Sequence, residues 1–188
     1  PASVREVTPE QLADEPVDVV VLQRPRDLEL AARWLRDRRV PAVYLEHDCP
    51  RGEVPHTRHP LADRSDVPLV HVTHFNALMW DSGRAPTTVI EHGVVDPGPL
   101  WTGELARLGA VVNDPARRGR LVGADLIPEF SRIAPVDLFG MNTDRIRGVS
   151  AYDLPQAELH ATLARRRVYV HPFRWTSLGL SLIEAMHL

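Results

Sequence analysis

The chain has 188 residues, 44% hydrophobic and 25% charged, a balance that is ordinary for a soluble globular protein. Its net charge of −3 gives no attraction for nucleic acid or an acidic membrane, and no apolar run approaches the roughly 20 residues of a membrane span. Cys49 is the only cysteine, so no internal disulfide can form, and we expect a cytoplasmic protein. All 22 basic residues are arginine, which leaves arginine as the only strong cation for a phosphate.

Strand and helix patterns alternate in the first half of the chain. The run at 17–23 (VDVVVLQ) is nearly continuous and rich in valine, as in a strand buried on both faces. Pro25 then opens a helical pattern with apolar residues three and four positions apart. Further strands are predicted at 42–47, 69–74 and 87–92, and a short helix at 75–83. The alternation predicts a parallel sheet covered on both sides.

Glycine and proline interrupt this alternation after residue 92. We predict a linker at 97–108 between an N-terminal domain at 1–96 and a C-terminal domain at 109–188. The second half then has predicted strands at 109–113, 136–140 and 168–173, and helices at 124–134, 153–166 and from 176 onward. The fold class is therefore α/β, with two Rossmann-like parallel-sheet halves. Both halves are expected to be incomplete, because the first lacks a Gly-rich opening turn and the second ends on a helix without a returning strand.

The residues at the carboxyl ends of the predicted strands are candidates for ligand binding, because ligands in open parallel sheets bind beyond these ends. These residues are His47, His74, His92, Asn113, Asp114, Gly140 and His171. Several histidines therefore fall at one edge of whatever sheet forms. A histidine at a strand end also occurs without any function, so this pattern alone leaves both interpretations open.

The last predicted helix carries a more informative pattern, TSLGLSLIEA. Thr176 and Ser177 are available as N-caps, and Gly179 lets a ligand approach the amides of the first turn. Free N–H groups and the helix dipole favour a phosphate there. If the helix begins at Thr176, Glu184 lies two turns further on, roughly 11–12 Å along the axis and on nearly the same face. A ribose along the helix then places its hydroxyls near this carboxylate; the alternative is a solvated surface glutamate.

The final stretch, HPFRWTSLGLSLIEAM, resembles the donor-site signature of family 4 glycosyltransferases, which have the two-Rossmann GT-B fold. Glu184 matches the glutamate that holds the nucleotide ribose in that family, and Gly179 and Leu180 match the segment whose backbone faces the diphosphate. Thr176 replaces the glutamate that contacts the transferred sugar. The resemblance therefore implies a nucleotide site, although it leaves the sugar contact undefined.

Three other segments fit the same resemblance. TTVIEHGVVDPG at 87–98 is similar to the stretch between the two domains. PAVYLEHDCP at 41–50 resembles the strand that ends in an active-site histidine, which implies a catalytic role for His47. VVNDPARRGR lies where the family binds the donor phosphates with Arg and Lys, so Arg117 or Arg118 is the expected counterpart of that lysine. Because family members continue beyond this helix, we expect an interior fragment of a longer enzyme.

The resemblance implies a glycosyltransferase that moves a sugar from a nucleotide-sugar donor to an unidentified acceptor, with retention of configuration and without a metal. Leu178, Leu182, Ile183 and Met186 are expected to pack on strand 168–173, and the uncovered sheet edge beside it predicts self-association. One alternative is a metal-dependent hydrolase that uses the His, Asp and Cys side chains at 47–59. Another is a non-catalytic fragment of a glycosyltransferase.

Overall fold

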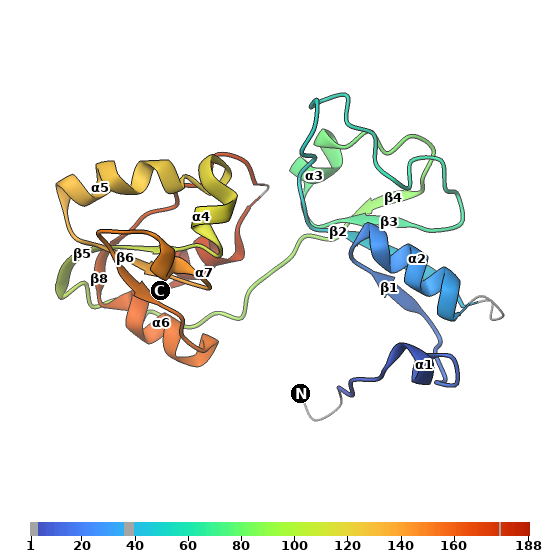
Figure 1. The fold of residues 1–188 in the computed structure, drawn as a ribbon, viewed down its shortest axis with the longest axis horizontal. Helices are drawn as coiled ribbons and strands as arrows, with labels where there is room; N and C mark the ends of the chain where they lie inside the picture. Colours follow the sequence, from blue (N-terminus) through green and yellow to red (C-terminus); the bar gives the residue numbers. More distant parts are fainter. Residues whose placement is uncertain (1–3, 36–39, 177) are drawn as a thin grey trace. The chain divides into compact units, whose positions relative to one another are not determined.

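The computed structural model describes residues 4–35, 40–176 and 178–188, and it divides the chain into two compact units, Pro1–His92 and Gly93–Leu188 (Figure 1). Each unit contains a four-stranded sheet in which all neighbouring strands are parallel. This confirms the predicted α/β fold class with two parallel-sheet halves. The boundary between the units falls between His92 and Gly93 in the sequence, a few residues before the predicted boundary at 96. No helix among the described residues is long and apolar enough to cross a membrane.

Unit 1 has its strands in chain order, β1-β2-β3-β4. The strands are β1 (Val20–Leu22), β2 (Ala42–Glu46), β3 (Leu69–His71) and β4 (Thr87–Val89). The helices are α1 (Pro9–Leu12), α2 (Pro25–Trp34) and α3 (His74–Met79). The core contains Leu22, Tyr44 and Leu69, against which Leu28 and Ala31 of α2 pack. The apolar spacing of α2 therefore has the role that the sequence predicted.

All four strands of unit 1 are shorter than the strands predicted from the apolar patterns. The largest difference is at 69–74, where β3 ends at His71 and α3 begins at His74. The side chain of Thr73 accepts a hydrogen bond from the backbone N–H of Asn76, which is an N-cap interaction. His74 therefore starts a helix and is exposed, which corrects the prediction that it ends a strand.

Unit 2 has the strand order β7-β6-β5-β8. The strands are β5 (Leu105–Val111), β6 (Val136–Phe139), β7 (Ser150–Tyr152) and β8 (Arg166–Tyr169). The α-helices are α4 (Pro115–Arg118), α5 (Ile127–Ile133), α6 (Gln156–Ala164) and α7 (Leu180–His187), and the 3-10 helices are η1 (Gly119–Val122), η2 (Ala124–Leu126) and η3 (Thr143–Arg145). The start of β5 at Leu105 lies inside the predicted linker, and β7 was not predicted.

The two faces of the second sheet differ in chemistry. One face carries Ala110, Val136 and Leu138 and packs on Ile127 of α5 in a buried apolar cluster. The other face carries a buried ion network, in which the carboxylate of Asp137 accepts hydrogen bonds from Arg107 and Arg166. Burial opposes ionisation of Asp137, but the hydrogen bonds from the two guanidinium groups outweigh it and lower its pKa.

Helix α7 begins later and turns a different face to the sheet than the sequence predicted. Its first residue is Leu180, with Gly179 as N-cap, because the segment before it is irregular. Met186 is 79% exposed, so the predicted apolar stripe does not pack as a whole. Ser181 faces β8 instead, and its hydroxyl accepts a hydrogen bond of 3.2 Å from the hydroxyl of Tyr169.

Strand β8 lies at the edge of its sheet, where the sequence predicts self-association. The segment 101–103 lies against the start of this strand. The indole N–H of Trp101 donates to the carbonyl of Arg166 at 3.0 Å, and the backbone N–H of Thr102 donates to the carbonyl of Ala164 at 3.0 Å. Val168 further along β8 is 47% exposed. Self-association through this edge remains a prediction.

Candidate functional site

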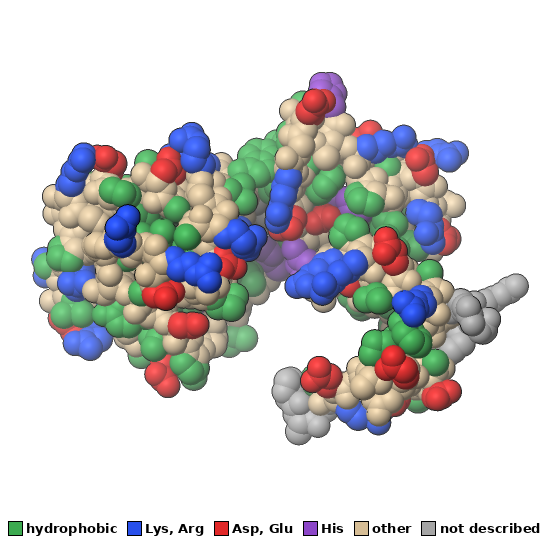
Figure 2. Space-filling model, viewed as in Figure 1, with side chains coloured by type: hydrophobic (Ala, Val, Ile, Leu, Met, Phe, Trp, Pro, Cys, Tyr) green, Lys and Arg blue, Asp and Glu red, His purple; other side chains and the backbone are tan. Residues whose placement is uncertain are grey.

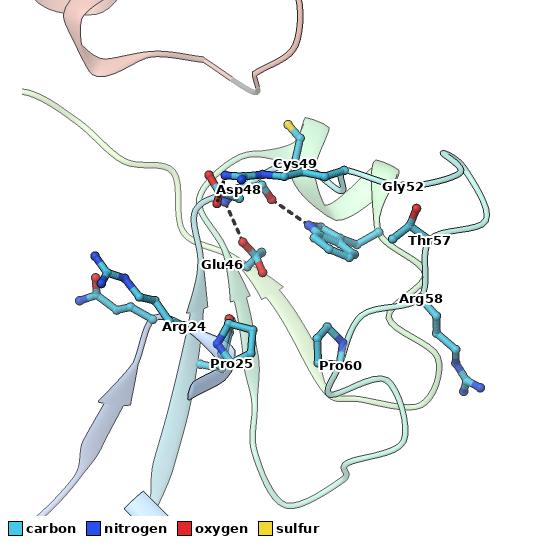
Figure 3. Close-up of a pocket in the computed structure, with 13 residues that line it drawn as sticks. Arg24, Pro25, Glu46, Asp48, Cys49, Gly52, Thr57, Arg58 and Pro60 are labelled. Atoms are coloured by element: carbon cyan, nitrogen blue, oxygen red, sulfur yellow. Dashed lines mark hydrogen bonds and ion pairs between the residues drawn. The ribbon is translucent and has the colours of Figure 1, made fainter. Parts of the chain in front are cut away.

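A pocket of about 400 Å³ lies in unit 1 near the carboxyl end of β2 (Figure 3). Its lining comes from the start of α2, from β2 and from the loop between β2 and β3. The lining residues are Gln23, Arg24, Pro25, Tyr44, Glu46, Asp48, Cys49, Arg51, Gly52, Thr57, Arg58, Pro60 and Trp80. Its volume lies in the range of small-molecule sites.

Glu46, the last residue of β2, provides a buried carboxylate in this pocket. One of its oxygens accepts the backbone N–H of Asp48 at 2.7 Å, which Figure 3 shows as a dashed line. The other oxygen lies 3.0 Å from Nε2 of His59, whose side chain is fully buried. Each carboxylate oxygen can accept more than one hydrogen bond, so the group can also receive donors from a ligand.

The tautomer of His59 follows from its second contact. The backbone N–H of Leu61 donates to Nδ1 of His59 at 3.0 Å, so Nδ1 must be an acceptor. Nε2 therefore carries the proton and donates it to Glu46. Edge-to-face contacts with Tyr44 at 5.2 Å and Trp80 at 5.0 Å hold the ring on two sides. With both nitrogens engaged, His59 acts by orienting the carboxylate of Glu46.

The aromatic walls of the pocket are also fixed. The indole N–H of Trp80 donates to the carbonyl of Asp48 at 2.8 Å, which ties α3's C-terminal end to the loop after β2. Burial raises the pKa of Tyr44, and the nearby Glu46 raises it further, so its phenol stays neutral. Among the described residues, the buried hydroxyl of Thr57 has no hydrogen-bond partner. The pocket therefore combines rigid apolar walls with polar atoms that can accept a ligand.

Cys49 is unsuited to nucleophilic chemistry. Its thiol is buried and donates a hydrogen bond of 3.2 Å to the side-chain oxygen of Asn76. Burial, together with the neighbouring Asp48 and Glu46, raises its pKa to about 11. The reactive thiolate is therefore scarce at neutral pH.

The three arginines that line the pocket differ in their partners. Arg51 pairs with Asp48 at 3.0 Å, and Arg58 pairs with Asp63 at 2.7 Å. Among the described residues, the Arg24 side chain makes no ion pair with a carboxylate, and in Figure 3 it extends outward from the start of α2. On the face shown in Figure 2, basic and acidic side chains are interspersed over both units. Within the described parts of the chain, Arg24 is therefore the pocket arginine whose charge no paired carboxylate offsets.

His47, the predicted catalytic residue, follows Glu46 directly and is exposed. Its Nε2 lies 3.1 Å from the side-chain oxygen of Gln23, which does line the pocket. Successive residues along a strand point to opposite faces, so the side chain of Glu46 points to the buried side and that of His47 does not. The structure thus places His47 beside the pocket, and the lining carboxylate that sequence reasoning missed is its neighbour.

In unit 2, the two predicted phosphate-binding arginines lie in α4, just beyond the carboxyl end of β5. Arg117 pairs with Asp114 at 3.1 Å, and this interaction lowers the pKa of Asp114. The guanidinium of Arg118 lies 5.7 Å from the ring centroid of Phe173, a cation–π arrangement. The two neighbouring arginines therefore point to different partners.

The aromatic contacts connect Arg118 to the start of α7. The ring of Phe173 stacks on His171 at 4.6 Å between centroids. A Cβ added to Gly179 would lie 3.1 Å from the His171 ring, a tight contact, so a glycine here lets the backbone approach the ring without displacing it. Burial lowers the pKa of His171, which keeps its imidazole neutral at pH 7. Arg118, His171, Phe173 and Gly179 thus form one group, here called the α7 entrance.

Glu184 lies away from the N-cap residues predicted to share its face. Because α7 begins at Leu180, Glu184 is only four residues into the helix, about 6 Å along its axis. Its carboxylate accepts a hydrogen bond of 3.0 Å from Gln156 and lies 3.4 Å from Nε2 of His160, both on α6. Thr176 precedes the helix in an irregular segment, and Ser177 lies outside the described residues.

The described residues do not gather three or more His, Cys, Asp or Glu side chains that could hold a metal ion. Cys49 contacts Asn76 and His59 contacts Glu46, so the segment at 47–59 does not converge on one point. His71 is buried on β3, whereas His74 is exposed at the start of α3. The structure therefore adds no support to the hydrolase alternative.

No known protein family, curated protein or solved structure matches this chain. The chemistry available to it therefore has to be argued from its own residues. Unit 1 offers a pocket with an oriented carboxylate. Unit 2 offers, at the carboxyl end of its sheet, an arginine beside the start of a helix.

Proposed function

We propose that this chain is a nucleotide-sugar-dependent glycosyltransferase, in which unit 2 binds the donor and unit 1 binds the acceptor. The observation that carries the proposal is the α7 entrance. Here the stacked rings of Phe173 and His171 connect Arg118 to the start of α7, where Gly179 is the N-cap. A cation and the positive end of a helix dipole in one group favour a diphosphate.

Arg118 is the better candidate for the phosphate contact. The carboxylate of Asp114 already offsets the charge of Arg117. Arg118 lies against the ring of Phe173, which stacks on His171 beside the helix start. A guanidinium binds phosphate oxygens through two parallel hydrogen bonds, and Arg118 is joined through Phe173 and His171 to a helix start that favours a phosphate. The proposal therefore assigns the role of the expected phosphate-binding cation to Arg118.

Glu184 retains a role as the ribose contact in this proposal, because a carboxylate oxygen that accepts one hydrogen bond can accept another. Gln156 and His160 fix the carboxylate and leave acceptor capacity for sugar hydroxyls. Leu180 and Gly179 provide the backbone of the helix start. In the reaction, the anomeric carbon exchanges its bond to the diphosphate oxygen for a bond to an acceptor hydroxyl oxygen. A nucleoside diphosphate and a proton are released.

A titration of the 188-residue chain with UDP, GDP and ADP tests the donor site. We expect one of them to bind, and Arg118→Gln to weaken that binding by about 1.5–3 kcal/mol, the range for hydrogen bonds to a charged group. The same variant should leave binding of the bare nucleoside unchanged, because only the diphosphate contacts the guanidinium. Glu184→Ala should weaken binding of both ligands, since both contain the ribose.

Arg117→Gln is the matched control. It removes the same charge one residue away, from a side chain that is paired with Asp114. We expect it to leave diphosphate affinity nearly unchanged. The proposal is wrong if none of the three diphosphates binds, or if Arg117→Gln and Arg118→Gln weaken binding equally.

A further inference from the structure

The pocket of unit 1 presents opposite charges from two elements. Glu46 provides a buried carboxylate at the end of β2, and Arg24 provides an exposed guanidinium at the start of α2. Asp27 already accepts the backbone N–H groups of Gln23 and Arg24, at 3.0 and 2.9 Å. The amides before α2 are therefore occupied, and an anion at this side of the pocket must be bound by the Arg24 side chain.

The carboxylate of Glu46 is suited to hydroxyl groups. Its position is fixed by the N–H of Asp48 and by His59, whose proton is held on Nε2. A carboxylate that is held in place accepts hydrogen bonds from ligand hydroxyls without losing freedom of its own. Thr57 also lines the pocket, and its hydroxyl is buried without a hydrogen-bond partner among the described residues. Ligand hydroxyls therefore match the carboxylate in this part of the pocket.

The remaining walls favour a small ring or chain with apolar C–H groups. Tyr44, Trp80 and Pro60 supply apolar surface in a volume of about 400 Å³. A purely cationic ligand fits less well, because it would lie beside the positive charge of Arg24, which no described carboxylate offsets. A ligand that carries both hydroxyls and an anionic group satisfies both ends.

We propose that this pocket binds a phosphorylated sugar or polyol, with hydroxyls on Glu46 and the phosphate on Arg24. This proposal rests on the proposed function, and it assigns the acceptor to the class of phosphorylated sugars and polyols. The guanidinium of Arg24 is exposed and makes no ion pair among the described residues, so its side chain is free to change rotamer when a ligand enters the pocket that it lines. A guanidinium then meets the phosphate through two parallel hydrogen bonds.

The test is calorimetric titration of the 188-residue chain with glucose 6-phosphate, fructose 6-phosphate and glycerol 3-phosphate, each beside its phosphate-free counterpart. At least one phosphorylated probe should bind about tenfold or more tightly than its counterpart, as a hydrogen-bonded charge predicts. Arg24→Gln should abolish that preference and leave the phosphate-free compound unaffected. Glu46→Gln should weaken both members of the pair by about tenfold.

Arg58→Gln is the matched control, because Arg58 lines the same pocket but pairs with Asp63, and in Figure 3 its side chain points away from Glu46. It should leave the phosphate preference intact. If Glu46→Gln does not fold, the exposed Arg24 variant still decides the question. The proposal is overturned if no probe prefers its phosphorylated form, or if Arg24→Gln and Arg58→Gln behave alike.

These outcomes are separable from those of the donor site. Arg118→Gln in unit 2 should leave sugar-phosphate binding unchanged. If the wild-type chain binds a nucleoside diphosphate but shows no preference for any phosphorylated probe, only the acceptor class is overturned. Sugar-phosphate binding without binding of any nucleoside diphosphate supports the pocket and overturns the proposed transferase.

Discussion

Replacement of Asp137 by asparagine should be among the most destabilising single changes in unit 2. Asp137 is fully buried on β6, and its carboxylate accepts hydrogen bonds from Arg107 and, at 2.7 Å, from Arg166. The Arg166 side chain is only 5% exposed, so water cannot replace the lost anion, whereas Arg107 is 30% exposed. An uncompensated buried charge costs about 3–5 kcal/mol. We therefore expect Asp137→Asn to reduce the unfolding free energy of unit 2 by that amount.

Hydrogen exchange of the β6 amides at pH 7 measures this loss, because their opening reports on unit 2. Arg107→Gln is the comparison: it leaves the Asp137–Arg166 pair in place and should cost about 1.5–3 kcal/mol. Arg166→Gln combined with Asp137→Asn should cost less than the sum of the two single changes, since it removes the unpaired charge. A loss below about 1 kcal/mol for Asp137→Asn would show that water or a rearranged neighbour compensates Arg166.

Two further predictions concern a glycine and a buried histidine. A Cβ added at Gly123 lies 2.1 Å from the carbonyl oxygen of Pro172, whereas one added at Gly148 meets nothing within 4 Å, although both residues have positive φ. Gly148→Ala should therefore cost about 1–2 kcal/mol and Gly123→Ala about 1–3 kcal/mol more; equal falls in Tm would contradict this. Burial, with nearby His59, lowers the pKa of His71 below its ordinary value of 6.5. The neutral imidazole therefore contributes fully to stability above about pH 6.5, and this contribution is lost as the pH falls through the folded-state pKa. When the pH is lowered from 7.5 to 5.5, hydrogen exchange of β2 should show a larger loss of stability for the wild type than for His71→Gln, by up to about 1.4 kcal/mol per pH unit. Identical losses in the two proteins would show that protonation of His71 does not cause the pH dependence.

The pattern of apolar runs predicted most strands, because a strand buried on both faces needs consecutive apolar residues. It failed where the local signal was weak or ambiguous. β7 has only three residues, Ser150–Tyr152, and no apolar run marks it. The start of α7 was misplaced because Thr176, Ser177 and Gly179 are all acceptable N-cap residues, and only the packing of the chain decides between them.

In the candidate site, too, the sequence indicated the right strand end, but only the folded structure distinguished the residues there. The sequence directed attention to the end of the second strand, but it selected the exposed His47 and missed the buried Glu46 beside it. No local signal distinguishes the two, since both are polar residues at a strand end. Their roles depend on which face of the strand is covered.

The amino-acid sequence by itself determined the α/β class, the two halves and the arginine-only cation chemistry, because these follow from composition and from periodicity along the chain. Only the tertiary structure brought His59 to Glu46, thirteen positions apart, and Arg166 to Asp137, twenty-nine apart. Such contacts depend on how loops return the chain and on the register between strands. Neither property is encoded in the spacing of neighbouring residues, so pairing of polar side chains across a fold is decided by packing of the whole unit.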